Sequence, residues 1–166
     1  LMGIKRKLGV KQISKKPILL NDLKLIIQAV TDEKNEFKKI QNKALILIGF
    51  AGGFRRSELV SIDYDDVDFV NEGVKINIKK SKTDQIGIGM VKAIPYFENT
   101  KFCPVVSLKD WINYAKINSG RIFKISDKSV ALIIKKYALI SGLDHSKYAG
   151  HSLRSGFATS TAETGA

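Results

Sequence analysis

The sequence holds a single cysteine, Cys103, among 166 residues, so no disulfide can form within the chain. This fits a reducing compartment, where structural disulfides are rare. A membrane helix needs about 18 consecutive apolar residues, and the longest apolar stretch, residues 44–51, is far shorter. The basic start is followed by neither an apolar segment nor a small-residue cleavage site, so the sequence predicts no secretory signal.

Positive charge dominates the composition, with 28 lysines and arginines against 16 acidic residues and a formal net charge of +12. Such a charge on a small domain favours a polyanionic partner, nucleic acid first and an anionic membrane surface second. The sign is uneven, because residues 1–16 carry six bases and no acid, whereas residues 58–72 carry six acids and no base. Charge alone selects no mechanism.

The first 16 residues predict a basic interdomain linker, because their apolar residues keep no period and glycines interrupt them. This segment is either a solvated tail or a strap along a phosphate backbone. In the second interpretation its DNA-binding side chains are Lys5, Arg6, Lys7 and Lys11. Residues 17–166 are expected to form one domain, which is long enough to bury a core.

Hydrophobic periodicity predicts a mostly helical α+β domain with a small three-stranded antiparallel sheet. Helices are expected at residues 21–30 with Asn21 as N-cap, at 36–51, 55–62, from 104, from 126 to a stop at Gly142, and from 153. The strands are expected at 74–78, through residues 86–90, and at 91–95. Residues 44–48 are all apolar, which predicts a central position for the second helix.

Three clusters carry candidate chemistry. In the first, Gly52 and Gly53 end one helix, and Arg55 and Arg56 stand where the next begins. Backbone N–H groups at a helix start favour an anion, and an arginine beside them can hold two phosphate oxygens at once. The alternative is that both arginines are solvated surface charges, with Glu58 as a local ion pair.

The second cluster is lysine-rich and spans residues 79–84, at the tip of the predicted hairpin. Lysines at such a tip are usually solvated, but a hairpin can also reach into a DNA groove and deliver one ammonium proton. In the third cluster, His151 and Arg154 lie three residues apart and share one face of a helix. An imidazole and a guanidinium that face the same way suit a reacting phosphate, although a histidine at a helix start can also simply cap or pack.

In this order and spacing, the three clusters resemble the tyrosine recombinases, the phage integrase family. Arg55 and Glu58 resemble the family's first catalytic box, in which an arginine lies three residues before a glutamate. His151 and Arg154 match its HxxR box within the sequence GHSLRSGFAT. The resemblance runs from about residue 15 to residue 166. It implies the fold of DNA breaking-rejoining enzymes, with Glu58 orienting the arginines from behind.

The resemblance implies that a tyrosine hydroxyl attacks a DNA phosphate and forms a 3′-phosphotyrosyl link, with no ATP, metal or other cofactor. Arg55 and Arg154 would hold the non-bridging oxygens. The lysine that protonates the leaving 5′-oxygen would be Lys82, with Lys80 as second choice. Lys80 is also expected to bind DNA. His151 would hydrogen-bond the phosphate or accept the tyrosine's proton.

The family places its nucleophilic tyrosine after the HxxR box, whereas all five tyrosines of this sequence precede His151. We therefore expect the chain to be an inactive catalytic-domain fragment of a longer recombinase. Double-stranded DNA is the expected partner. Other protomers, as a tetramer on paired sites, and a cytoplasmic, nucleoid-associated location follow from the resemblance, and no membrane partner is expected.

Three alternatives stay open at this point. A non-catalytic DNA-binding relic of the same fold is one, although the arginine, lysine and HxxR residues are all retained. A basic RNA-binding protein would need stacking aromatics on an exposed sheet, and the predicted strands offer Val, Ile, Lys and Asn instead. A type IB topoisomerase shares the chemistry of the tyrosine recombinases.

Overall fold

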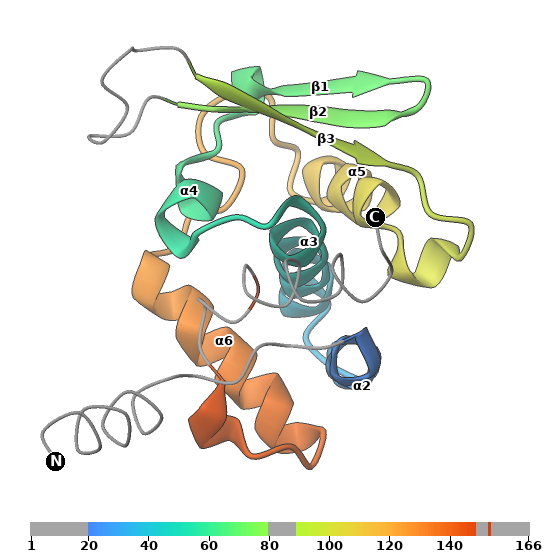
Figure 1. Cartoon of the computed structure of the whole chain (residues 1–166), viewed down its shortest axis with the longest axis vertical. Coiled ribbons are helices and arrows are strands. Elements are labelled where there is room, and N and C mark those ends of the chain that lie inside the picture. The colour runs from blue at the N-terminus through green and yellow to red at the C-terminus, as the bar shows by residue number, and fades with distance from the viewer. Residues whose placement is uncertain (1–19, 80–88, 149–152, 154–166) are drawn as a thin grey trace, which may run out of the picture.

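The computed structural model describes residues 20–79, 89–148 and 153. In chain order the α-helices, 3₁₀-helices (η) and strands are α2 (Leu20–Thr31), α3 (Glu36–Gly52), α4 (Arg56–Ser61), η1 (Tyr64–Asp66), β1 (Val67–Val70), β2 (Gly73–Ile78), β3 (Met90–Pro95), η2 (Thr100–Phe102), α5 (Pro104–Tyr114), α6 (Asp127–Ile140) and η3 (His145–Lys147). The expected α+β class, mostly helical with a three-stranded antiparallel sheet, is confirmed (Figure 1).

Helix α3 lies at the centre of the domain. Figure 1 shows α5 and the sheet on one side of it and α2 and α6 on the other. The apolar residues 44–48 are each at most 2% exposed, because helices and the sheet surround this segment. Helix α5 packs along α3, and α2 packs against both α3 and α6. The central position predicted from the all-apolar run is therefore confirmed.

Both ends of α3 follow from local sequence. At the start, Oδ1 of Asn35 accepts a hydrogen bond from the backbone N–H of Lys38 at 3.0 Å. At the end, Gly53 adopts the left-handed conformation with φ of 62°, which costs glycine no steric penalty. Its neighbour Gly52 is needed for space, because a β-carbon there would lie 2.3 Å from the ring of Phe54. The predicted stop at these two glycines is confirmed.

Most other helix boundaries were also predicted correctly. Ser126 is the N-cap of α6 and accepts the N–H of Ser129, and Gly142 has a φ of 80° just beyond its end. The prediction for Asn21 was wrong, because this residue lies inside α2 and not at its cap. A capping residue expresses only a local preference, and here Leu20 continues the helix in the N-terminal direction.

The sheet has the order β1-β2-β3, with both pairs antiparallel. Two expectations need correction. The first strand, β1, was not predicted, because its four residues lie in the acidic run and are too few to show a period. Residues 90–95 form one strand, β3, and Met90 pairs with Ile78; the expected return and third strands are thus continuous in the described part. Ile86 and Ile88 lie outside the described residues.

None of the helices in the described part is both long and apolar enough to cross a membrane. The predicted basic linker at residues 1–16 lies outside the described residues, and the division into linker and catalytic domain stays a prediction.

Two tyrosines are built into the core. Tyr137 on α6 is fully buried; its hydroxyl donates to Oε2 of Glu33 at 2.9 Å and accepts from the amide of Asn42 at 3.0 Å. Tyr148 is 1% exposed and donates to Oδ2 of Asp22 at 2.8 Å. Burial, and then the hydrogen bond to a carboxylate, raise the pKa of each tyrosine to about 12.

We expect alkaline pH to destabilise the domain through these tyrosines. The pKa of Tyr137 is about 12 in the folded chain against an ordinary value of 10. Its contribution to stability is therefore complete below pH 10 and is lost as the pH rises towards 12. Tyrosinate absorbance, recorded against pH together with circular dichroism, should show a late ionisation that is smaller in the Tyr137→Phe variant and absent when Tyr137 and Tyr148 are both replaced by phenylalanine. Ionisation of all tyrosines in one step near pH 10 with the fold intact would contradict this.

Candidate functional site

Arg55 is the N-cap residue of α4 and follows directly the turn that ends α3. Its side chain is exposed, and its backbone N–H donates to Oε1 of Glu58 at 2.8 Å. Guanidinium groups cannot accept hydrogen bonds, so the carboxylate alone supplies the capping contact. Among the described residues no ion pair joins Glu58 to Arg55 or Arg56. Glu58 therefore holds the backbone of Arg55, and the local ion pair considered from sequence is wrong.

The side chain of Lys92 on β3 is hydrogen-bonded to the turn that precedes Arg55. Its Nζ donates to the carbonyl of Gly52 at 2.6 Å and to that of Gly53 at 3.0 Å, and it lies 4.7 Å from the centroid of the Phe54 ring. A cation at the carbonyl end of a helix is favourable, and so is a cation over an aromatic face. Lys92 thus ties the second strand of the β2–β3 hairpin to the segment that carries Arg55.

Leu153 is the described residue of the HxxR segment, and it lies against α3. Its side chain is 1% exposed. A β-carbon placed on Gly49 would lie 2.7 Å from Cδ1 of Leu153 and 3.2 Å from Cδ2 of Leu59 on α4. The carbonyl of Gly49 also accepts the N–H of Phe54 at 3.1 Å. The last turns of α3 therefore hold both the middle of the HxxR segment and the turn that leads into Arg55.

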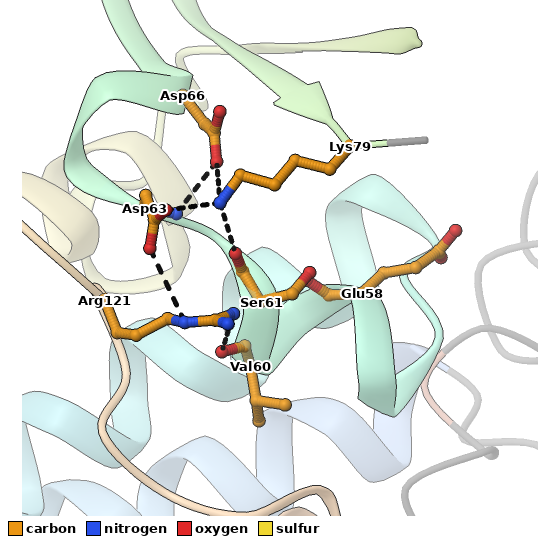
Figure 2. A network of polar contacts seen from close by, with 7 residues as sticks. All are labelled: Glu58, Val60, Ser61, Asp63, Asp66, Lys79 and Arg121. Carbon is orange, nitrogen blue, oxygen red and sulfur yellow. Dashed lines mark hydrogen bonds and ion pairs between the residues drawn. The ribbon is translucent and has the colours of Figure 1, made fainter. Parts of the chain in front are cut away.

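A network of charged groups holds the end of β2 (Figure 2). Lys79 directly follows this strand, and its Nζ donates to the carboxylate of Asp63. It also lies 3.3 Å from Oδ2 of Asp66 and 3.3 Å from the carbonyl of Ser61, the last residue of α4. On its other side, Asp63 faces Nε of Arg121 at 3.6 Å. The first strand of the hairpin is thereby tied to the far end of α4.

The family model of the phage integrase family matches residues 18–166. The chain belongs to this family. It is 46% identical, over 97% of this chain and 50% of the relative, to an integrase/recombinase XerD homologue of Selenomonas ruminantium. It is 27% identical, over 77% of this chain and 43% of the relative, to the tyrosine recombinase XerD of Haemophilus ducreyi. The chain thus spans about half the length of these relatives, or less.

Solved structures agree with the family in fold. XerH bound to its difH substrate in a pre-cleavage complex matches with a TM-score of 0.70 and 20% identity, over 90% of this chain and 44% of that one. The lambda integrase catalytic core matches with a TM-score of 0.58 and 17% identity, over 90% of this chain and 85% of that one. The described residues therefore have the fold of a tyrosine recombinase catalytic domain, as the resemblance implied.

Most of the site residues predicted from the family motifs lie outside the described residues: Lys5, Arg6, Lys7, Lys11, Lys80, Lys82, His151 and Arg154. Their roles stay predictions. The described residues contain no group of three histidine, cysteine or acidic side chains that could hold a metal ion.

Sequence reasoning missed Lys92, Asp63 and Arg121. The sequence does contain a signal for a role of Lys92 inside the fold. Lys92 lies two residues before the buried Ile94, so both side chains are on the same face of the strand. A lysine at an inward position of a strand indicates an acceptor within the fold. Asp63 stands in an acidic run close in sequence to a basic hairpin, which favours a contact between the two. Which acid meets which base depends on the register of β2 and on the path of the loop at Arg121.

The Lys92→Met substitution should lower the free energy of unfolding by about 1–3 kcal/mol, because two helix-end carbonyls lose a charged donor. Urea unfolding of the 166-residue chain measures this change. Lys75→Met on β2 is the matched control: its side chain is exposed, so we expect a change within about 0.5 kcal/mol. Equal effects of the two substitutions would rule out a special role for Lys92.

Gly49 and Leu153 should be energetically coupled. Gly49→Val crowds the Leu153 side chain and should destabilise the chain by about 1–3 kcal/mol. In a Leu153→Ala background the same substitution should cost less, because the smaller side chain vacates the space. A double-mutant cycle by urea unfolding should give a coupling of about 0.5–3 kcal/mol. Simple addition of the two effects would place Leu153 away from Gly49.

Proposed function

We propose that this chain is the catalytic-domain part of a site-specific DNA recombinase, which cleaves and rejoins strands through a 3′-phosphotyrosyl intermediate. The observation that carries the proposal is the packing of Leu153, the third residue of the HxxR box, against Gly49. Gly49 also anchors the turn before Arg55. Leu153 and the turn that leads to Arg55, which are about a hundred residues apart in sequence, therefore meet at one end of α3. Membership of the phage integrase family supports the same chemistry.

In this mechanism, Arg55 and Arg154 neutralise the charge that builds up on the non-bridging oxygens as the phosphorus becomes five-coordinate. Lys82 donates a proton to the 5′-oxygen as the bond between phosphorus and that oxygen breaks. His151 binds the phosphate or takes the proton of the attacking tyrosine. Glu58 keeps Arg55 in place through its backbone, so the guanidinium stays available for the phosphate.

The attacking tyrosine is not expected to be Tyr137 or Tyr148. Both are buried with their hydroxyls bonded to carboxylates, and the pKa of each is raised to about 12. A hydroxyl in that state can neither reach a DNA phosphate nor ionise easily near neutral pH. The exposed tyrosines Tyr64, Tyr96 and Tyr114 precede the HxxR box, whereas the family places its nucleophile after that box, and on this resemblance we place the nucleophile there in the full-length product.

Double-stranded DNA is the proposed partner, in line with the net charge of +12. The solved XerH structure, similar in fold, is a complex with its difH DNA substrate. We propose that the full-length protein works in the cytoplasm on nucleoid DNA, as a tetramer on paired sites.

Arg154→Ala should reduce DNA cleavage by the full-length product by about 10²–10³-fold, because one charge that stabilises the transition state is lost. Arg55→Ala should have an effect of similar size. Arg56→Ala is the matched control, since it removes the same charge one residue away and should leave cleavage within a few-fold of wild type. Cleavage is measured by covalent trapping on SDS gels. The substrates are nicked duplexes that together cover the DNA flanking the gene, and a mobility-shift assay measures DNA binding by each variant.

Cleavage by Arg154→Ala at the wild-type rate would contradict the site assignment. In the same assay the 166-residue chain alone should form no covalent adduct, and an SDS-stable adduct on it would identify one of its five tyrosines as the nucleophile. Absence of an adduct with the full-length product on every duplex, together with retained DNA binding, would favour the non-catalytic relic.

A further inference from the structure

The ion-pair network at the base of the β2–β3 hairpin consists of groups that the proposed reaction does not use. Lys79 contacts Asp63, Asp66 and the carbonyl of Ser61. Figure 2 shows these groups converging on the Lys79 ammonium, while the Glu58 side chain points away from them. An isolated exposed ion pair contributes little to stability. A network at the base of the hairpin can instead act by fixing the position of the end of β2.

Asp63 is itself held from several sides. Its backbone N–H donates to Oδ2 of Asp66 at 2.9 Å, and it forms an isolated antiparallel bridge with Arg121. Arg121 in turn donates to the carbonyl of Val60 at 3.2 Å, and the next residue, Ile122, donates to the carbonyl of Ile62 at 2.9 Å. The carboxylate that receives Lys79 is therefore part of a fixed frame made by the end of α4 and the loop at Arg121.

Lys79 is suited to anchoring and poorly suited to giving up a proton. The hydrogen bond to Asp63 raises the pKa of Lys79 above its ordinary value. The same hydrogen bond holds the pKa of Asp63 below its ordinary value. Both groups thus keep their charges around neutral pH, and the contact persists under the conditions in which DNA cleavage takes place.

The anchor lies within reach of the proposed site. Helix α4 has six residues, so about 9 Å separate its Ser61 end, where Lys79 binds, from its Arg55 end. Lys82 follows Lys79 by three residues, and three extended residues span at most about 10 Å. The chain between the anchor and Lys82 is therefore long enough to cover the length of α4, and the anchor limits how far from Arg55 the Lys82 ammonium can lie.

We propose that Asp63 and Lys79 are positioning residues, whose contact fixes the base of the β2–β3 hairpin and thereby places the hairpin lysine at the leaving 5′-oxygen. The inference rests on the function proposed above and adds to it a device that controls proton delivery. The Lys92 contact with Gly52 and Gly53 ties β3 to the turn before Arg55, whereas Lys79 ties the end of β2 to the far end of α4, so the two strands are held at opposite ends of this helix.

The chemistry of the leaving group offers a direct test. With oxygen at the bridging 5′ position, the bond between phosphorus and O5′ breaks, its electron pair stays on oxygen, and the lysine supplies the proton. With sulfur at that position, the leaving group is a thiolate, which is a far weaker base and leaves without a proton. A defect in proton delivery should therefore disappear on the sulfur substrate, whereas a defect in folding, DNA binding or charge stabilisation should remain.

The experiment uses the full-length product of the gene and the nicked duplex identified by covalent trapping, made with either oxygen or sulfur at the bridging position. Asp63→Asn and Lys79→Met should each slow cleavage of the oxygen substrate by about tenfold or more and cleave the sulfur substrate at nearly the wild-type rate. The double variant should be no slower than either single one, because both act through one contact. Lys79→Arg, which keeps the charge, should recover most of the rate.

Lys82→Ala is the reference for a lost proton donor and should show a larger oxygen defect that sulfur also removes. Asp65→Asn is the matched control, since Asp65 is an exposed acid of the same segment and should behave as wild type. The positioning role is overturned if Asp63→Asn cleaves the oxygen substrate normally, or is equally slow on both substrates, while Lys82→Ala is rescued by sulfur. If sulfur rescues no hairpin-lysine variant, neither Lys82→Ala nor Lys80→Ala, the proposed proton donor fails first and the inference falls with it.

Discussion

The site depends on how α3 ends. The last turn of a helix leaves carbonyl groups without intrahelical partners. Here the left-handed Gly53 lets the chain fold back, so that the N–H of Phe54 reaches the carbonyl of Gly49, and Lys92 takes the carbonyls of Gly52 and Gly53. The next residue of the chain is Arg55. A helix end that has to satisfy its own backbone thus also fixes the backbone position of Arg55, which we propose as a phosphate-binding residue.

The same helix end gathers the other parts of the site. Leu153 packs against Gly49, where the absence of a side chain leaves room for it. Strand β3 is joined to the same helix end by the hydrogen bonds of Lys92. The central position of α3 makes this possible, since its residues 44–48 are enclosed by the rest of the fold and cannot shift without disturbing the core. Leu153 and the turn before Arg55, which are distant in sequence, are therefore both held against one buried helix, which suits the proposed stabilisation of a transition state by preorganised charges.

The uneven charge distribution also acquires a structural meaning. The acidic run at residues 58–72 lies in a strongly basic protein, and two of its members hold basic groups of the chain itself: Asp63 contacts Lys79 and Arg121, and Asp66 contacts Lys79. Acids used in this way order neighbouring segments and leave other basic residues for an anionic partner. The contacts are partly exposed and contribute little to stability one by one, so their value lies in geometry.

The sequence by itself determined the local features. Asn35, Gly53, Pro104 and Ser126 set helix ends through capping and backbone preference, and the apolar run of α3 indicated its central position. The family motifs predict Arg55 and Glu58 as site residues, because the spacing of a motif can be recognised without any knowledge of the fold. Short elements with little periodicity escaped prediction, as the strand Val67–Val70 shows.

Only the tertiary structure decided which groups meet across the chain. In the folded chain, the Glu58 carboxylate accepts the backbone N–H of Arg55, and Lys79 donates to Asp63. Lys92 donates to a carbonyl at the end of α3, and Leu153 packs against Gly49. The physical reason is that hydrogen bonds and ion pairs act over a few ångströms. Such short distances between residues far apart in sequence arise from the packing of α3, α4 and the sheet together, and no local pattern contains them.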